Sequence, residues 1–216
     1  MLSQLRPAIT MIALFSALTG LAYPLAVTGI AQIFLRGPAD GSLVTRDGRV
    51  VGSRLIGQNF ASAGYFQGRP SATSAPDPKD ASKTVDAPYN AANSVGSNLG
   101  PTSQKLADRV KASVAALGGS PARLVPADAV TTSGSGLDPD ISPANAALQV
   151  PRVAAARKLP ADQVQGLVDH NTARHFGEAL VNVLALNLAL DKVGPASGSP
   201  MSSQPQGSSA AAAQAR

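Results

Sequence analysis

The stretch "PAITMIALFSALTGLAYPLAVTGIAQIFL", residues 7–35, contains no charged residue and decides the organisation of the whole chain. Arg6 and Arg36 lie on either side of it. At about 1.5 Å per residue, a helix of this length extends roughly 40 Å, which is enough to cross a hydrocarbon core of about 30 Å. We therefore predict a transmembrane helix over residues 7–35, preceded by a short N-terminal segment at residues 1–6.

A cleaved signal peptide is the alternative interpretation of this stretch. Its apolar region would be about 7–15 residues long and would end in a small-residue cleavage site. The run here is longer, and "AQIFLRG" at residues 31–37 places bulky side chains where small ones are needed. We therefore favour an uncleaved single-pass anchor. Pro24 lies within the span and is expected to bend the helix or to pack against a neighbour that satisfies the freed carbonyl.

The charges around the span leave its orientation open. Arg6 precedes it, whereas Arg36, Arg46, Arg49 and Arg54 follow it. A positive-inside count would keep the C-terminal part in the cytoplasm, but that rule is weak for long translocated domains. Both orientations therefore stay open when the residues alone are considered.

Composition limits what the rest of the chain can be. The stretch from residue 36 to residue 192 is long enough for one domain with its own core. The sequence has no cysteine, a scattered formal charge of +5 and only 4% aromatic residues. Nucleic-acid binding requires a basic stripe and aromatic faces for stacking, so the composition argues against that class. Residues 193–216 are rich in Gly, Ser, Pro and Ala and are predicted to be a disordered tail.

Local signals in this region are mixed and predict an α+β domain. Residues 42–60 predict two short strands around an Asp47-Gly48 turn. Residues 64–101 are rich in Pro, Gly, Ser and Asn and predict a long loop, whereas residues 102–117 have the apolar spacing of a helix.

Further helices are predicted towards the C-terminus. Pro143, behind Ser142, opens one that Pro151 is expected to kink or restart, and Pro160 opens another. The alternating leucines of "VNVLALNLAL", residues 181–190, favour a strand with one buried face, although a helix is also compatible with them. The predicted fold is thus one transmembrane helix followed by a mixed α+β domain over residues 36–192.

The loop "TTSGSGLDPDISP", residues 131–143, is the densest cluster of small and acidic residues. It lacks the Gly-Lys pair of a P-loop and the G-x-S-x-G pattern of a serine hydrolase. The single glutamate, Glu178, does not complete an EF-hand, and His170 and His175 have no third partner for zinc. No catalytic constellation and no metal site is therefore predicted.

We predict a structural role for this loop. Its small residues make a tight turn, its two aspartates accept backbone amides, and Ser142-Pro143 caps the next helix. The residues concerned are Ser133, Gly134, Ser135, Gly136, Asp138 and Asp140.

Blocks of sequence along the chain resemble the KdpC family, the C subunits of Kdp potassium-transporting P-type ATPases. The resemblance covers residues 5–193 and leaves only the tail without a counterpart. After the N-terminal anchor, the blocks are "GSRLIGQNF", "YFQGRPSA", "YNAANSVGSNLGP", "VPADAVTTSGSGLDPDISPANAALQVPRVAAAR" and "VNVLALNLALDKV".

This resemblance implies a non-catalytic subunit of a bacterial inner-membrane complex that transports potassium. The N-terminus at residues 1–6 would be cytoplasmic and the domain at residues 36–192 periplasmic. The implied partners are a channel-like potassium-translocating subunit, a P-type ATPase subunit and a very small single-span subunit, together with membrane lipid. No covalently bound cofactor and no nucleic acid is expected.

Two functions stay open under this resemblance. The chain could be a structural subunit whose domain caps the potassium entrance, or a catalytic chaperone that raises the ATP affinity of the ATPase subunit. The family's candidate nucleotide contact matches Gln149, in "AALQVPR". A periplasmic domain is separated by roughly 40 Å or more from ATP in the cytoplasm, so any effect would have to pass through the transmembrane helix. We therefore favour helix-end hydrogen bonding next to Pro151 as the role of Gln149.

Overall fold

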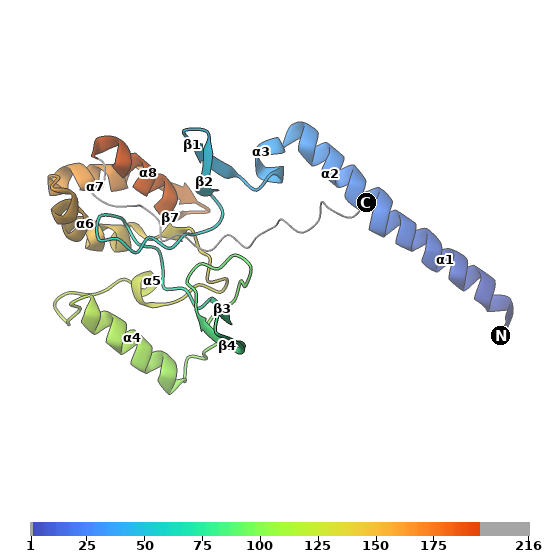
Figure 1. The fold of residues 1–216 in the computed structure, drawn as a ribbon, viewed down its shortest axis with the longest axis horizontal. Helices are drawn as coiled ribbons and strands as arrows, with labels where there is room; N and C mark the ends of the chain where they lie inside the picture. The colour runs from blue at the N-terminus through green and yellow to red at the C-terminus, as the bar shows by residue number, and fades with distance from the viewer. Residues whose placement is uncertain (1, 195–216) are drawn as a thin grey trace. The chain divides into compact units, whose positions relative to one another are not determined.

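The computed structural model describes residues 2–194 (Figure 1). These residues divide into two compact units, of which the first ends at Ser53 and the second begins at Arg54. Apart from its first two residues, the predicted tail at residues 193–216 lies outside the described range.

One long apolar helix dominates the first unit. It runs for 30 residues from Leu5 to Phe34, and none of its most apolar window is buried against the rest of the described chain. Its length and composition suit a membrane span, as the sequence predicted. Its parts are α1 (Leu5–Ala17), the π-helical η2 (Leu18–Ala22) and α2 (Tyr23–Phe34), preceded by the 3-10 turn η1 (Leu2–Gln4).

The helix widens immediately before Pro24. Proline has no backbone N–H and therefore cannot donate to the carbonyl one turn earlier. The preceding turn, η2, is π-helical, and the N–H of Tyr23 donates to the carbonyl of Leu18, five residues back. The distortion that the sequence predicted at Pro24 thus takes the form of a π-helical turn inside a continuous helix.

A short helix and a hairpin complete the first unit. Asp47 and Gly48 connect the two strands with left-handed φ angles of 51° and 74°. A turn with two left-handed residues favours Asp-Gly, so the predicted hairpin is confirmed. The elements are α3 (Arg36–Ala39), β1 (Leu43–Arg46) and its antiparallel partner β2 (Arg49–Ser53).

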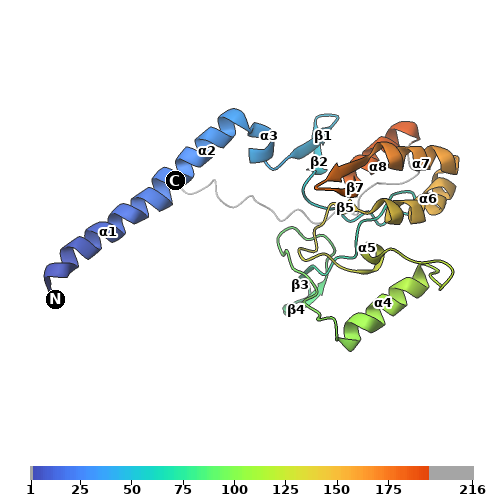
Figure 2. The same ribbon diagram turned by 180° about the vertical axis from the view of Figure 1, so that it is seen from behind.

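Three helices and a small antiparallel sheet form the core of the second unit, and they gather side by side in Figure 2. The strand order is β5-β7-β6. The strands are β5 (Asp140–Ile141), β6 (Thr172–His175) and β7 (Glu178–Asn182), and the helices are α6 (Pro143–Arg157), α7 (Ala161–His170) and α8 (Val183–Val193). Their buried apolar side chains include Ile141, Val153, Val164, Val168, Leu186 and Leu190.

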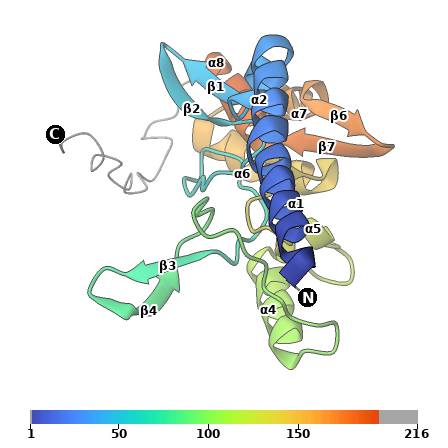
Figure 3. The same ribbon diagram turned by 90° about the vertical axis from the view of Figure 1, so that its right-hand side faces the viewer.

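The remaining elements of this unit correct one prediction. Residues 64–101 were expected to be a long loop, but β3 (Ser74–Asp77) and β4 (Asp80–Asp86) form an antiparallel hairpin within them. Pro76 lies inside β3 and concealed the strand, because proline is disfavoured in strands except at edges. Figure 3 shows this hairpin apart from the three core helices. Two further helices follow it, α4 (Gln104–Ala116), as predicted, and α5 (Ala127–Val130).

The start of α6 follows the predicted capping signal. The side chain of Ser142 accepts a hydrogen bond from the N–H of Asn145, and Pro143 occupies the first turn of α6. The helix then runs through Pro151 to Arg157 without restarting.

The strand that was favoured over residues 181–190 is wrong beyond Asn182. The side chain of Asn182 accepts a hydrogen bond from the N–H of Ala185 and so begins α8. Residues 183, 186, 187 and 190 are buried, which is the spacing of one helix face. Over so short a stretch, leucines at every second position fit both a strand and a helix face. Their alternation therefore indicated the period of a strand where the structure has a helix.

A charge placed in the long helix should prevent membrane integration. We expect Leu21→Arg to move the full chain out of the carbonate-resistant membrane fraction, because a charge near mid-span costs roughly 2.5–3.5 kcal/mol on insertion scales. Leu21→Ile is the control and should behave like the parent chain. A mature N-terminus after residue 36 would instead show that the segment is a signal peptide.

Candidate functional site

The segment Ala63–Arg69 contacts both α6 and α8, and its residues 64–66 are buried. Tyr65 and Phe66 are only 2% and 0% exposed. No described strand pairs with this segment. Its backbone N–H and C=O groups must therefore find partners elsewhere in the protein.

Two side-chain amides supply those partners. The Nδ2 of Asn187 in α8 donates to the carbonyl of Phe66 at 2.9 Å, and its Oδ1 accepts the N–H of the same residue at 2.8 Å. The side chain of Gln149 in α6 does the same for Gln67, with distances of 3.0 Å from Nε2 and 2.8 Å to Oε1. We call these four residues the amide clasp. Each amide makes the two backbone hydrogen bonds that a neighbouring β-strand would otherwise make.

Two arginines extend the clasp towards Ala63. The Nη1 of Arg152 donates to the carbonyls of Ala63 at 2.7 Å and Tyr65 at 3.1 Å. Burial of the guanidinium lowers the pKa of Arg152. Nearly every backbone acceptor of the segment is thus paired with a side chain.

Arg157 closes the same end of the segment. Its Nε donates to the carbonyl of Gly64 at 2.6 Å, and its Nη2 forms an ion pair of 2.8 Å with Asp191. The guanidinium also lies 4.5 Å from the centroid of the Tyr65 ring. The side chains of Arg157 and Asp191 are 1% and 11% exposed, so the buried charge is compensated by a close partner.

All polar atoms of the Gln149 side chain are engaged. Besides its two bonds to Gln67, its Nε2 donates to Asn145 Oδ1 at 2.9 Å, and its Oε1 accepts from Arg152 Nη2 at 2.6 Å. The predicted helix-end hydrogen bonding next to Pro151 is wrong, because Gln149 lies inside α6 and two of its four hydrogen bonds go to the distant Gln67. Sequence reasoning missed Asn187, for which the only signal was an amide among the leucines of α8.

The loop at residues 131–143 forms the predicted tight turn. Ser133 Oγ accepts the N–H of Gly136 at 2.9 Å, and Ser135 Oγ accepts that of Leu137 at 3.1 Å. Gly136 has a left-handed φ of 68°. The Oγ of Ser71 donates to the carbonyl of Gly136 at 2.7 Å, so the turn is fastened to the segment after the clasp.

The two aspartates of this loop differ in their partners. Asp138 Oδ1 accepts the N–H of Asp140 at 3.1 Å, as predicted, and its Oδ2 pairs with Arg69 Nη1 at 3.0 Å. The expected backbone partner of Asp140 is replaced by a side chain, since its Oδ1 accepts from Asn182 Nδ2 at 2.9 Å. Asp140 therefore links the loop to the end of β7.

Tyr89 supports the arginine of this ion pair. Its hydroxyl donates to the carbonyl of Arg69 at 2.7 Å. Burial raises the pKa of the Tyr89 phenol, and the carboxylate of Asp138 raises it further. The hydroxyl therefore remains protonated and keeps donating.

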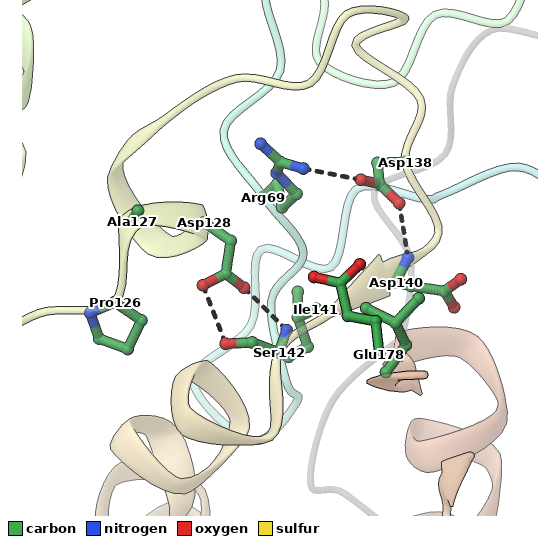
Figure 4. A pocket seen from close by; sticks show the side chains of 10 residues that line it. Arg69, Pro126, Ala127, Asp128, Asp138, Asp140, Ile141, Ser142 and Glu178 are labelled. Carbon is green, nitrogen blue, oxygen red and sulfur yellow. Dashed lines mark hydrogen bonds and ion pairs between the residues drawn. The ribbon is translucent and has the colours of Figure 1, made fainter. Parts of the chain in front are cut away.

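An acidic hollow of about 460 Å³ opens beside the loop (Figure 4). Asp128 is held there by three donors, namely the N–H and Oγ of Ser142 and the Nδ2 of Asn145. Four carboxylates and one guanidinium contribute to the lining, so its charge is negative. The charged residues are Asp128, Asp138, Asp140, Glu178 and Arg69.

The predicted site residues do not come together in one place. The hollow is lined by Asp138 and Asp140 but not by Gln149, which belongs to the amide clasp. Within residues 2–194, no group of three His, Cys, Asp or Glu side chains is placed to hold a metal ion.

Comparison with known proteins identifies the family. The family model described as "KdpC: K+-transporting ATPase, c chain" matches residues 5–192. The chain belongs to the KdpC family. The KdpC match includes the long apolar helix, the amide clasp and the acidic hollow, and it confirms the resemblance found in the sequence.

Curated KdpC relatives match over almost their full length. The "Potassium-transporting ATPase KdpC subunit" of Methylorubrum extorquens is 62% identical over 195 residues, which are 88% of this chain and 97% of the relative. The protein of the same name from Bradyrhizobium diazoefficiens is 59% identical over 197 residues, 89% of this chain and 98% of the relative. That from Rhodopseudomonas palustris is 58% identical over 200 residues, 90% of this chain and 100% of the relative.

Steric fit should matter more than charge in the loop. We expect Gly136→Val to destabilise the domain by about 1–3 kcal/mol or more, because a left-handed residue is held there. A Cβ would also lie 2.6 Å from the carbonyl oxygen of Val95. Asp138→Asn should cost at most about 1 kcal/mol, since its ion pair is partly exposed. Thermal unfolding of the full chain in detergent measures both.

Gly134→Ala is the matched control for this comparison, because nothing lies within 4 Å of a Cβ at that position. It should unfold like the parent chain. The reverse ranking, with Asp138→Asn abolishing transport in an assembled complex, would indicate ion or ligand chemistry in the loop.

Proposed function

We propose that this chain is a non-catalytic subunit of a Kdp-type potassium-transporting ATPase complex, and that its folded domain serves assembly rather than nucleotide binding. Family membership and the names of the relatives support the complex. The amide clasp supports the role of the domain, because Gln149, the candidate nucleotide contact, is already fully hydrogen-bonded within the protein.

Direct contact between Gln149 and ATP would require the clasp to open. Opening it would leave Oδ1 of the buried Asn145 without its donor, and an unpaired buried group costs about 1–3 kcal/mol. The acidic hollow offers no alternative for a polyphosphate, because its carboxylates outnumber its one arginine and repel negative charge. The geometry thus favours a scaffold over a nucleotide site.

The resemblance to the KdpC family supports a proposed arrangement in the membrane. We place the long helix in a bacterial inner membrane, with residues 1–6 in the cytoplasm and the second unit in the periplasm. Potassium is the transported ion, and the partners are the channel-like subunit, the P-type ATPase subunit and the small single-span subunit. If the ATP affinity of the ATPase subunit responds to this chain, the effect passes through the helix as a shift between pump states.

Substitution of Gln149 separates a scaffold from a nucleotide site. We expect Gln149→Ala to lower the free energy of unfolding by roughly 1–3 kcal/mol, because Oδ1 of the buried Asn145 loses its donor. Neither the parent chain nor the variant should bind ATP saturably in the micromolar range. Calorimetric titration and thermal unfolding of the full chain in detergent provide the two measurements.

Gln165→Ala is the matched control. The amide of Gln165 bonds only to the exposed Asp169 one turn away, so its removal should cost a few tenths of a kcal/mol, in the range of about 0.2–0.5 kcal/mol. Saturable micromolar ATP binding that is lost in Gln149→Ala, but kept in Gln165→Ala, would contradict the proposal.

A further inference from the structure

A phenylalanine stands fully exposed at the tip of the hairpin formed by β6 and β7. The relative exposure of Phe176 is 112%, the highest value among the exposed large apolar residues of the described chain. His175 pairs with Glu178, so Phe176 and Gly177 form the whole turn. The core of the domain therefore gains nothing from this ring.

The turn itself does not call for an aromatic residue. Phe176 and Gly177 have left-handed φ angles of 50° and 91°. The turn between β1 and β2 has the same two left-handed positions and carries Asp47 and Gly48. Such turns prefer Asn or Asp before Gly, whereas a bulky side chain is strained there. Phe176 is thus unfavourable for both conformation and solvation, which points to a role outside the domain.

The acidic hollow has a lining residue two positions after Phe176 along the chain. Glu178, the first residue of β7, lines the hollow together with Asp140 and Asp128 (Figure 4). The only cation of the lining, Arg69, is already paired with Asp138. A partner that covers Phe176 therefore meets a negatively charged surface next to it.

We propose that Phe176 and the acidic hollow form one docking surface for another protein, whose surface presents a lysine or arginine beside an apolar socket. The inference rests on the proposed function, in which that protein is another subunit of the complex. An aromatic residue that fills a socket and a charge pair beside it are the usual features of an interface hot spot.

The charge of the hollow excludes two other occupants. Anionic phospholipid headgroups would be repelled by the carboxylates, so a bilayer surface is a poor partner for this tip. A symmetric contact between two copies of this chain would bring two negative hollows together. A protein surface with an apolar socket and a nearby cation can cover the Phe176 ring and pair with the carboxylates of the hollow.

The substitution Phe176→Asn separates docking from folding. Asparagine suits the left-handed turn, so the unfolding temperature of the full chain in detergent should stay the same or rise. Association with the other subunits, co-expressed and purified as a complex, should weaken about 30-fold, as for loss of an aromatic hot spot. Leu124→Ser removes another apolar side chain that is 83% exposed and should leave association unchanged.

Charge provides a second measurement. We expect Glu178→Lys to weaken association more than Glu178→Gln, and the difference to shrink as salt is raised. A photo-reactive phenylalanine analogue at position 176 should cross-link to another subunit. Cross-links to lipid only, to a second copy only, or to nothing would overturn the inference.

The same purification distinguishes this inference from the proposed function. If the parent chain itself fails to co-purify with the other subunits, both the function and the docking surface are wrong. If the parent chain and Phe176→Asn co-purify with equal affinity, only the docking surface is wrong.

Discussion

A buried stretch of backbone whose hydrogen bonds come from side chains is the constraint on which the second unit depends. Phe66 is completely buried, and its N–H and C=O are both taken by Asn187 of α8. Gln149 of α6 makes the same two hydrogen bonds with the backbone of Gln67. Because unpaired polar groups are costly in a core, the packing of α8 around the buried Phe66 depends on the amide of Asn187.

This constraint assigns Gln149 a role within the domain, whereas the family resemblance suggested a contact with nucleotide. An amide that faces a ligand must have free donors and acceptors, whereas every polar atom of Gln149 has a partner. Polar side chains of the loop at residues 131–143 are also hydrogen-bonded within the domain. Ser133, Ser135 and Asp138 all accept backbone amides. The residues that looked most like a binding site have their polar atoms hydrogen-bonded within the domain.

Features that depend on neighbouring residues could be predicted from the sequence, and features that depend on distant residues could not. The apolar span, the Asp47-Gly48 turn and the Ser142 cap are each determined within a few positions, and all were found. The start of α8 was missed because the alternating leucines favoured a strand, and the cap formed by Asn182 became evident only in the structure. The amide clasp joins residues that are 82 and 121 positions apart, so no local sequence pattern predicts it.

The same separation sets an order of events during synthesis. The chain emerges from its N-terminus, and Phe66 cannot obtain its partner until Asn187 has been made, 121 residues later. At about 5–20 residues per second, this delay is on the order of 6–24 s. Throughout that interval the backbone of Phe66 lacks its native partner, so the core of the second unit cannot be completed before its last helix has been made.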